Sequence, residues 1–250
     1  MRSPLDGLFL GRRNYAEAHA FMMELYEARR EGLIQDTVLL LEHSPVITLG
    51  RGAKHEHLLR SRDELEALGV ELMETGRGGD VTLHAPGQLI AYPIVDLSPD
   101  RRDVRKYVQG LTRVMNALAA QYDLNGGTIK ELIGLWIDLN DPQRWPGETH
   151  AINPVKLGAI GVRISRWVTT HGFALNLSTD LSLFDLIVPC GIRGRGVTSI
   201  AQLTGVTPDL SLVARKSLEL LNNEWGAGSP RWYDLRDKKL AHPRLTASLE

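Results

Sequence analysis

The hydrophobic and polar residues of the chain follow two periods in turn, one typical of helices and one typical of strands. Apolar residues recur at helical spacing after Asn14, which forms a candidate capping box with Glu17, and again after the candidate cap Asp103. A short helix is expected over about 61–69 and a last one over about 209–225.

Short runs rich in Val, Leu and Ile lie between these helices and predict strands. The expected strands cover about 37–43, 46–49, 70–74, 81–84, 88–95, a pair within 128–139, 156–165, 167–177 and 197–200. Pro93 inside one of them predicts an edge strand or a bulge, because proline cannot donate a ladder hydrogen bond. The strands come in clusters rather than alternating with helices. This order indicates the α+β class, a mixed or antiparallel sheet flanked by helices.

The pattern also favours a single domain over residues 1–250. No repeat, low-complexity tract or flexible linker divides the chain, and its length suffices to fold without a metal or a disulfide. Residues 140–154 hold three prolines and are expected to form a long surface loop, and 226–250 are expected to be a peripheral tail.

Composition and charge narrow the class of function. Lys and Arg number 29 against 30 Asp and Glu, a net charge of −1, which argues against a general nucleic-acid binder. No run approaches the ~18 consecutive apolar residues of a membrane helix. The N-terminus lacks the apolar region of a signal peptide, so a cytoplasmic protein is expected. The single cysteine excludes an internal disulfide and a cysteine-rich metal cluster.

Three segments are richer in glycine and polar residues than an ordinary core. The first, 77–88, combines an arginine, a glycine pair, a strand-borne histidine and a Pro-Gly turn. Glycines let a ligand approach the backbone closely and make its N–H groups accessible as donors. A simple tight turn between strands is the alternative for this segment.

The second and third segments hold a lysine and the cysteine. Lys156 opens a strand that, like its neighbour 167–176, is rich in small residues, which suits a channel for an extended ligand. The alternatives are that Lys156 is a solvated residue at the edge of a sheet and that His171 is a hydrogen-bonded residue of the core. Cys190 lies in a Pro-Cys-Gly loop beside two arginines, and nearby cations favour the nucleophilic thiolate. From the residues alone, a catalytic thiol and a small structural side chain remain equally open.

Together these segments resemble the lipoyl(octanoyl) transferase family. The resemblance extends from about Tyr15 to Leu203 and rests on four ordered blocks: LLLLEHSPVITLGR, RGGDVTLHAPGQLIAYPIVDL, KLGAIGVRISRWVTTHGFALNLSTDLSLFDLIVPCGI and GVTSI. It implies the α+β fold shared with biotin protein ligases and lipoate ligases. It also implies an acyltransferase of protein lipoylation that moves an octanoyl or lipoyl group without a cofactor or a metal.

The resemblance implies roles for individual residues. Cys190 would hold the acyl group as a thioester, and Lys156 would lower the pKa of that cysteine and act as a base. The implied substrate-binding residues are Arg77, Gly78, Gly79, Asp80, Val81, Thr82, Leu83, His84, Ala159, Ile160, Gly161, Gly172, Phe173 and Ala174. Ala85 and Gly158 depart from the usual family motif, a difference that concerns the acyl pocket rather than the reaction.

The implied partners are octanoyl acyl carrier protein as donor and, as acceptors, lipoyl domains of 2-oxoacid dehydrogenases and the glycine cleavage H protein. No nucleic acid or membrane partner is expected, and the protein is expected to be a monomer. Two groups of basic residues could dock an acidic carrier protein or could simply be solvated. One group, near the start of a helix, is Arg101, Arg102, Arg105 and Lys106; the other, in the cysteine loop, is Arg193 and Arg195. The run His55-Glu56-His57 is expected to be solvated surface rather than a metal site.

Two other functions remain open at this point. An ATP-dependent lipoate or biotin ligase of the same fold would activate its acid as an adenylate and would need no acyl-cysteine, so the pair Cys190 and Lys156 argues against it. A non-catalytic protein that only binds acyl carrier or lipoyl domains would tolerate the loss of Cys190.

Overall fold

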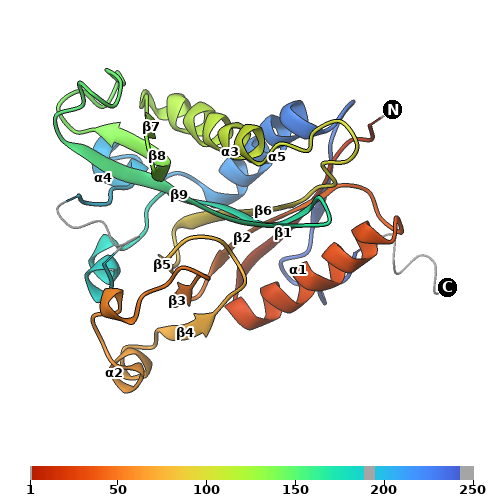
Figure 1. Ribbon diagram of the computed structural model, residues 1–250, viewed down its shortest axis with the longest axis horizontal. Helices are drawn as coiled ribbons and strands as arrows, with labels where there is room; N and C mark the ends of the chain where they lie inside the picture. Colours follow the sequence, from red (N-terminus) through yellow and green to blue (C-terminus); the bar gives the residue numbers. More distant parts are fainter. Residues whose placement is uncertain (1, 189–194, 243–250) are drawn as a thin grey trace.

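Two sheets organise the chain in the computed structural model, which describes residues 2–188 and 195–242 (Figure 1). The large sheet has eight strands in the order β11-β1-β2-β6-β10-β9-β8-β7, and the small sheet has three in the order β4-β3-β5. The large sheet joins β1 to β2 and β11 in parallel, whereas the pairs from β2 through to β7 are antiparallel. The expected α+β class with a mixed sheet is confirmed.

The strands are β1 (Asp6–Arg13), β2 (Thr37–His43), β3 (Val46–Leu49), β4 (Glu71–Glu74), β5 (Val81–His84), β6 (Gln88–Ile94), β7 (Gly127–Ile129), β8 (Leu132–Asp138), β9 (Pro154–Ser165), β10 (Val168–Asn176) and β11 (Arg231–Asp234). The helices are α1 (Tyr15–Arg30), α2 (Arg62–Ala67), α3 (Val104–Ala119), α4 (Ile200–Thr204) and α5 (Leu210–Trp225), with 3-10 turns η1 (His55–His57), η2 (Ala120–Tyr122) and η3 (Leu181–Leu186).

Helices cover both faces of the large sheet. α3 and α5 pack on one face and α1 on the other, each over its own hydrophobic core (Figure 1). The caps expected for α1 and α3 are confirmed: the side chains of Asn14 and Asp103 accept hydrogen bonds from the N–H groups of Glu17 and Lys106. Ser61 likewise forms a complete capping box at the start of α2.

The expected edge position of the strand with Pro93 is wrong. β6 lies inside the large sheet, between β2 and β10. Its ladder to β10 runs only as far as Ala91, and pairing returns as a single bridge at Asp96. Pro93 therefore falls in a gap of the β10 ladder, where its missing N–H costs no hydrogen bond. Opposite this gap, His171 of β10 has a φ of +56°.

The expected strand over 197–200 is also wrong. Val197 makes one isolated bridge to Lys156, and Ser199 then accepts a hydrogen bond from the N–H of Gln202 as the cap of α4. Two strands were not predicted, β1 and β11. They pair with each other in parallel, and β11 lies within the segment expected to be a peripheral tail.

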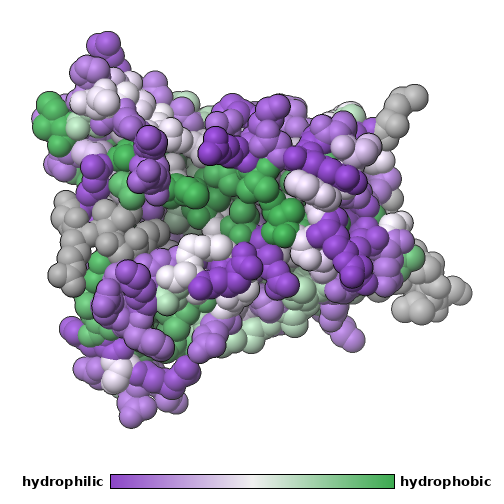
Figure 2. All heavy atoms as spheres, viewed as in Figure 1, coloured by the Kyte–Doolittle hydropathy of each residue, from purple (hydrophilic) through white to green (hydrophobic). Residues whose placement is uncertain are grey.

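The small sheet lies beside β9 and β10 and carries its own hydrophobic core. Figure 2 shows a band of apolar side chains across the middle of one face of the molecule, over β9, between more polar surfaces. In β9 the partly buried Ile160, Val162 and Ile164 pack against the core under α3 and α5. Within the described residues, no helix is long and apolar enough to cross a membrane.

Candidate active site

A pocket opens between the two sheets, with walls from the loop before β5, from β5 itself and from β9 and β10. Most residues that the resemblance implies for substrate binding meet here: Arg77, Gly79, Asp80, Val81, Thr82, His84, Ala159, Ile160, Gly161, Gly172, Phe173 and Ala174. Gly78 and Leu83 do not line it. The N–H of Gly78 donates to the carbonyl of Val162, 2.9 Å away, and the Leu83 side chain packs into the core of the small sheet.

The loop before β5 is held in place by the buried Arg77. Its guanidinium donates to the hydroxyl and the carbonyl of Thr48 on β3 and to the carbonyl of Gly78. Gly79 has a φ of +89°, which favours glycine. Its carbonyl would lie 2.3 Å from a Cβ on Gly50, so the two backbones approach more closely than side chains would allow. The glycines of this loop therefore serve its shape as well as ligand access.

The inner end of the pocket is lined by rings that the sequence did not assign to the site, from Tyr15 of α1, Tyr92 of β6 and His171 of β10. Tyr92 donates its O–H to Nε2 of His43, at 3.0 Å, while Nδ1 of His43 donates to the carbonyl of Arg13. The ring of His171 lies edge-on to Tyr92, with centroids 5.7 Å apart. In the sequence, each of these residues stands out only as a histidine or tyrosine within an apolar run. An ordinary hydrophobic core produces the same pattern.

Burial keeps these rings uncharged. It lowers the pKa of His43 to about 4 and that of His171 to about 3, and it raises the pKa of Tyr15 to about 12. The pKa of His84 is also well below its usual value, first because of burial and then because of His43 nearby. At neutral pH the inner pocket is therefore polar but without charged rings.

A chain of hydrogen bonds fixes His84 at the pocket wall. Its Nδ1 donates to the side-chain carbonyl of Gln88 at 2.7 Å, and the Gln88 amide donates to Asn176 at 2.8 Å. Asn176 donates in turn to the carbonyl of Thr198, whose N–H bonds the carbonyl of Lys156. His84 is thus connected to the start of β9 through the side chains of Gln88 and Asn176 and the backbone of Thr198.

Lys156 faces the pocket side of β9 because of a bulge. The register between β8 and β9 shifts by one residue between Leu135 and Trp136, so Trp136 lies opposite Lys156, and Leu157 lies in the core beneath α3. Lys156 and Ala159 consequently line the same hollow, although in a regular strand residues three apart point to opposite faces. This hollow shares Thr82, Ala159 and Ala174 with the main pocket.

The Lys156 side chain is buried, at 6% exposure, which contradicts a solvated edge lysine. Its Nζ donates to the carbonyl of Ile133 at 3.3 Å and lies 4.9 Å from the ring centre of Trp136. Its backbone N–H donates to the carbonyl of Gly196 at 3.0 Å. β9 therefore holds both this lysine and the chain that follows the cysteine segment.

Cys190 lies outside the described residues, as does Arg193. The described chain before them is anchored through Val188, whose N–H donates to the carbonyl of His57 at 2.8 Å. His57 itself is buried, and its Nδ1 bonds the Asp80 carboxylate at 2.5 Å. The expectation of a solvated surface is therefore wrong for His57, because it joins the pocket loop to the chain before the cysteine. His55 and Glu56 are exposed as expected.

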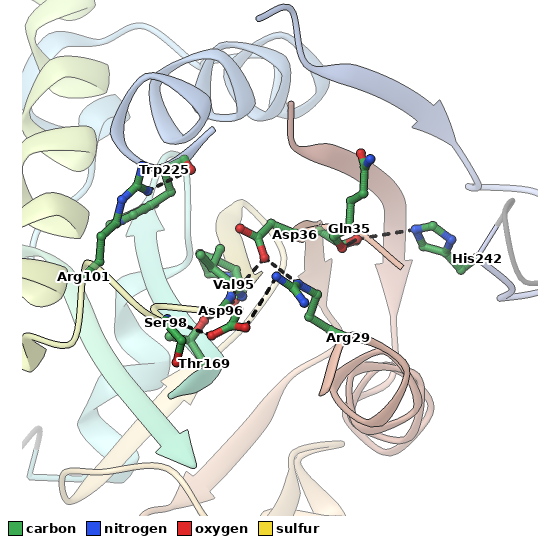
Figure 3. Close-up of polar contacts among 12 residues, drawn as sticks. Arg29, Gln35, Asp36, Val95, Asp96, Ser98, Arg101, Thr169, Trp225 and His242 are labelled. Atoms are coloured by element: carbon green, nitrogen blue, oxygen red, sulfur yellow. Dashed lines mark hydrogen bonds and ion pairs between the residues drawn. The ribbon is translucent and has the colours of Figure 1, made fainter. Parts of the chain in front are cut away.

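The basic residues before α3 lie far from Lys156. Arg101 donates to the carbonyl of Trp225 at 2.8 Å, and in a separate set of contacts Arg29 bonds Asp36 and faces Asp96 (Figure 3). Arg102 lies over the ring of Trp167, at the turn between β9 and β10. Nine residues of β9, at about 3.3 Å each, separate Lys156 from Ser165 at this turn, roughly 30 Å. Arg195 lies at the other end, 5.8 Å from the ring centre of Trp136.

No group of three or more His, Cys, Asp or Glu side chains in residues 2–188 and 195–242 is placed to hold a metal ion. The chemistry that the described site offers is that of a buried amine, an imidazole held by Gln88, and backbone groups of a glycine-rich loop.

Residues 14–221 match the model of the lipoyl protein ligase A/B catalytic domain family. The chain belongs to this family. It is 46% identical to an octanoyltransferase of Solibacter usitatus over 207 residues, which cover 83% of this chain and 86% of that one. It is 49% identical to an octanoyltransferase of Myxococcus xanthus over 196 residues, 78% of this chain but only 52% of that longer protein. The enzyme is therefore an acyltransferase that moves octanoyl groups in protein lipoylation.

Solved structures of lipoate ligases share the fold. A putative lipoate protein ligase of T. acidophilum with bound lipoic acid superposes with a TM-score of 0.67 at 13% identity, covering 99% of this chain and 92% of that one. A biotin protein ligase of Aquifex aeolicus in complex with biotin and ATP gives 0.51 at 12% identity, with 88% and 69% covered. The ligase-like fold expected from the sequence is confirmed.

Proposed function

We propose that the enzyme takes the octanoyl group from acyl carrier protein, holds it on Cys190 as a thioester, and passes it to a lysine of a lipoyl domain with Lys156 moving the protons. The observation that carries this proposal is the position of Lys156. Its amine is buried beside the pocket, on the strand whose backbone bonds the chain next to the cysteine segment.

In the first half-reaction the Cys190 thiolate attacks the carbonyl carbon of the carrier thioester. A new C–S bond forms, the C–S bond to the carrier's pantetheine breaks, and the released thiolate takes a proton from the Lys156 ammonium. One thioester replaces another, so the step is nearly balanced in free energy and needs no ATP. The cations near the cysteine favour its thiolate.

In the second half-reaction the amine of the acceptor lysine attacks the Cys190 thioester. A C–N bond forms and the C–S bond to Cys190 breaks, while the proton lost by the attacking amine passes to the now neutral Lys156. Cys190 leaves as a thiolate beside the Lys156 ammonium, which restores the starting state. Formation of an amide from a thioester makes this half-reaction favourable.

The uncharged rings of the pocket favour an apolar acyl chain as the ligand. Ala159, Gly161, Gly172 and Ala174 keep its walls thin, and the rings at its inner end carry no charge at neutral pH. Charged rings would have to lose their hydration to accept eight carbons, whereas the two charged groups of the wall are already bonded, Arg77 to Thr48 and Asp80 to His57.

The test is an intact-mass spectrum after mixing the purified enzyme with octanoyl carrier protein in the absence of ATP. We expect one octanoyl group on the wild type, none on Cys190→Ala, and loss of the adduct when an apo lipoyl domain is added. A dependence of lipoyl-domain octanoylation on ATP would instead indicate a ligase. Binding of both proteins without acyl transfer would indicate a carrier-binding protein, and an adduct on Cys190→Ala would remove the cysteine from the reaction.

A further inference from the structure

Trp136 is a buried tryptophan that faces a cation instead of apolar side chains alone. Its side chain is 1% exposed, and its indole N–H donates to the carbonyl of Leu132 at 2.8 Å. This hydrogen bond, together with burial, fixes the plane of the ring. The Lys156 ammonium lies 4.9 Å from the ring centre. A tryptophan face attracts a cation at this range, most strongly where water is excluded.

The bulge in β9 creates this contact. Leu135 and Ile137, on either side of Trp136, face the core beneath α3, so Trp136 faces the pocket side of the sheet. Directly opposed residues of two antiparallel strands project from the same face. Without the one-residue shift, Trp136 would oppose Leu157, and Lys156 would turn toward the core. The strand pair is thus irregular at the position that places the lysine on the ring.

A second contact of the ammonium is oriented as well. The carbonyl of Ile133 accepts from Nζ at 3.3 Å, and Ile133 lies three residues before Trp136 on the same strand. β8 therefore supplies both a ring face and a carbonyl to one amine. Arg195 brings a second cation to the same ring, at 5.8 Å from its centre, next to the cysteine segment. A plain core position would place no charged group on this ring.

We propose that Trp136 is a positioning residue that acts through Lys156: its ring face holds the amine at the pocket and keeps it from turning toward solvent. The inference rests on the proton-moving role proposed for Lys156. Trp136 touches no reacting atom in this scheme, so its loss should lower the turnover rate and leave substrate affinity largely unchanged.

The test compares Trp136→Leu, which removes the aromatic face, with Trp136→Phe, which keeps one. Trp167→Leu is the matched control, because Trp167 also carries a cation but lies at the far end of β9. We expect Trp136→Leu to lower kcat for octanoyl transfer about 10-fold, with KM within about twofold, and Trp136→Phe to recover most of the rate. Trp167→Leu should match the wild type. Urea unfolding of each variant reports whether it is folded.

A double-mutant cycle decides whether Trp136 acts through Lys156. The readout is alkylation of the chain's single cysteine by iodoacetamide, which needs no substrate and reports the thiolate. Trp136→Leu should slow alkylation in the wild type and have no further effect in Lys156→Ala. Equal rates for the Leu and Phe variants, or additive effects in the cycle, would overturn the inference. If Lys156→Ala itself alkylates and turns over like the wild type, the proposed role of Lys156 fails first, which separates the two failures.

Discussion

Two tryptophan–cation pairs lie at the two ends of β9, and they differ in their surroundings. At the start of the strand, Lys156 lies 4.9 Å from the centre of Trp136, and both side chains are buried. At the turn after the strand, Arg102 lies 5.8 Å from the centre of Trp167, and the arginine is exposed. The geometry is similar, but water surrounds only the second cation.

The difference shows how burial changes the meaning of one kind of contact. In water, an ammonium or guanidinium keeps its hydration and gains little from a ring. In a dry site the ring replaces part of the lost hydration and restricts where the cation can lie. The same contact is therefore a surface detail at Trp167 and a means of placing an amine at Trp136.

The largest expected effect separates the two cations. Lys156→Met should lower octanoyl transfer by about 10²–10⁴-fold, because it removes the group that moves the protons while keeping a long apolar side chain. Arg102→Met, at the other end of the strand, should leave the rate within about twofold. Steady-state transfer to an apo lipoyl domain, followed by mass spectrometry, measures both. Comparable losses in the two variants would mean that burial does not distinguish the pairs.

A second prediction extends the contrast to histidines. The pKa of His171 is about 3 when folded, against about 6.5 in an unfolded chain, so below pH 6.5 the unfolded state binds a proton that the folded state does not. The free energy of unfolding should therefore fall on acidification, by roughly 1.4 kcal/mol per pH unit for this histidine between pH 6 and 4. Asparagine tolerates the positive φ of this position, so His171→Asn should show a shallower slope.

Urea unfolding at pH 7, 6 and 5 provides the measurement for this second prediction. His150→Asn is the control, because His150 is exposed on the loop between β8 and β9, and its slope should equal that of the wild type. A slope that is unchanged in His171→Asn would show that the ring is protonated in the folded protein.

The smallest expected effect concerns the basic residues near the start of α3. Reversal of Arg102 and Arg105 to glutamate should change KM for octanoyl carrier protein by less than about twofold in physiological salt, because these exposed charges lie roughly 30 Å from Lys156 and are screened at that range. Arg195→Glu, beside the cysteine segment, should raise this KM more. The salt dependence of KM for the three proteins checks this, and a larger effect of the α3 reversal would place the carrier at that end.

The helices and the fold class could be predicted because their signals are local. Asn14 and Asp103 cap their helices through residues three positions away. Each strand is likewise recognised from the apolar and polar residues within its own short run. β1 could not be found in this way. Its partners start at Thr37 and at Arg231, and a pairing across more than 200 residues leaves no local pattern.

The site could be predicted in part for the same reason. The glycine-rich loop and Lys156 stand in short motifs, whereas Tyr15, Trp136 and His171 come from three separate elements and look like core residues in their own segments. His57 was misjudged because its polar neighbours suggested solvent. Its burial depends on Asp80, which lies 23 residues later.

The one-residue shift between β8 and β9 has a consequence for how members of this family can be compared. One residue inserted in β8 between Leu135 and Trp136, opposite Leu157, would preserve every residue of the site, yet it would restore regular pairing with β9 and turn Lys156 and Trp136 toward the core. Two chains can thus share the same lysine in an alignment and differ in whether it reaches the pocket. The register of β8 against β9 therefore matters as much as the presence of the lysine for whether its amine lies at the pocket.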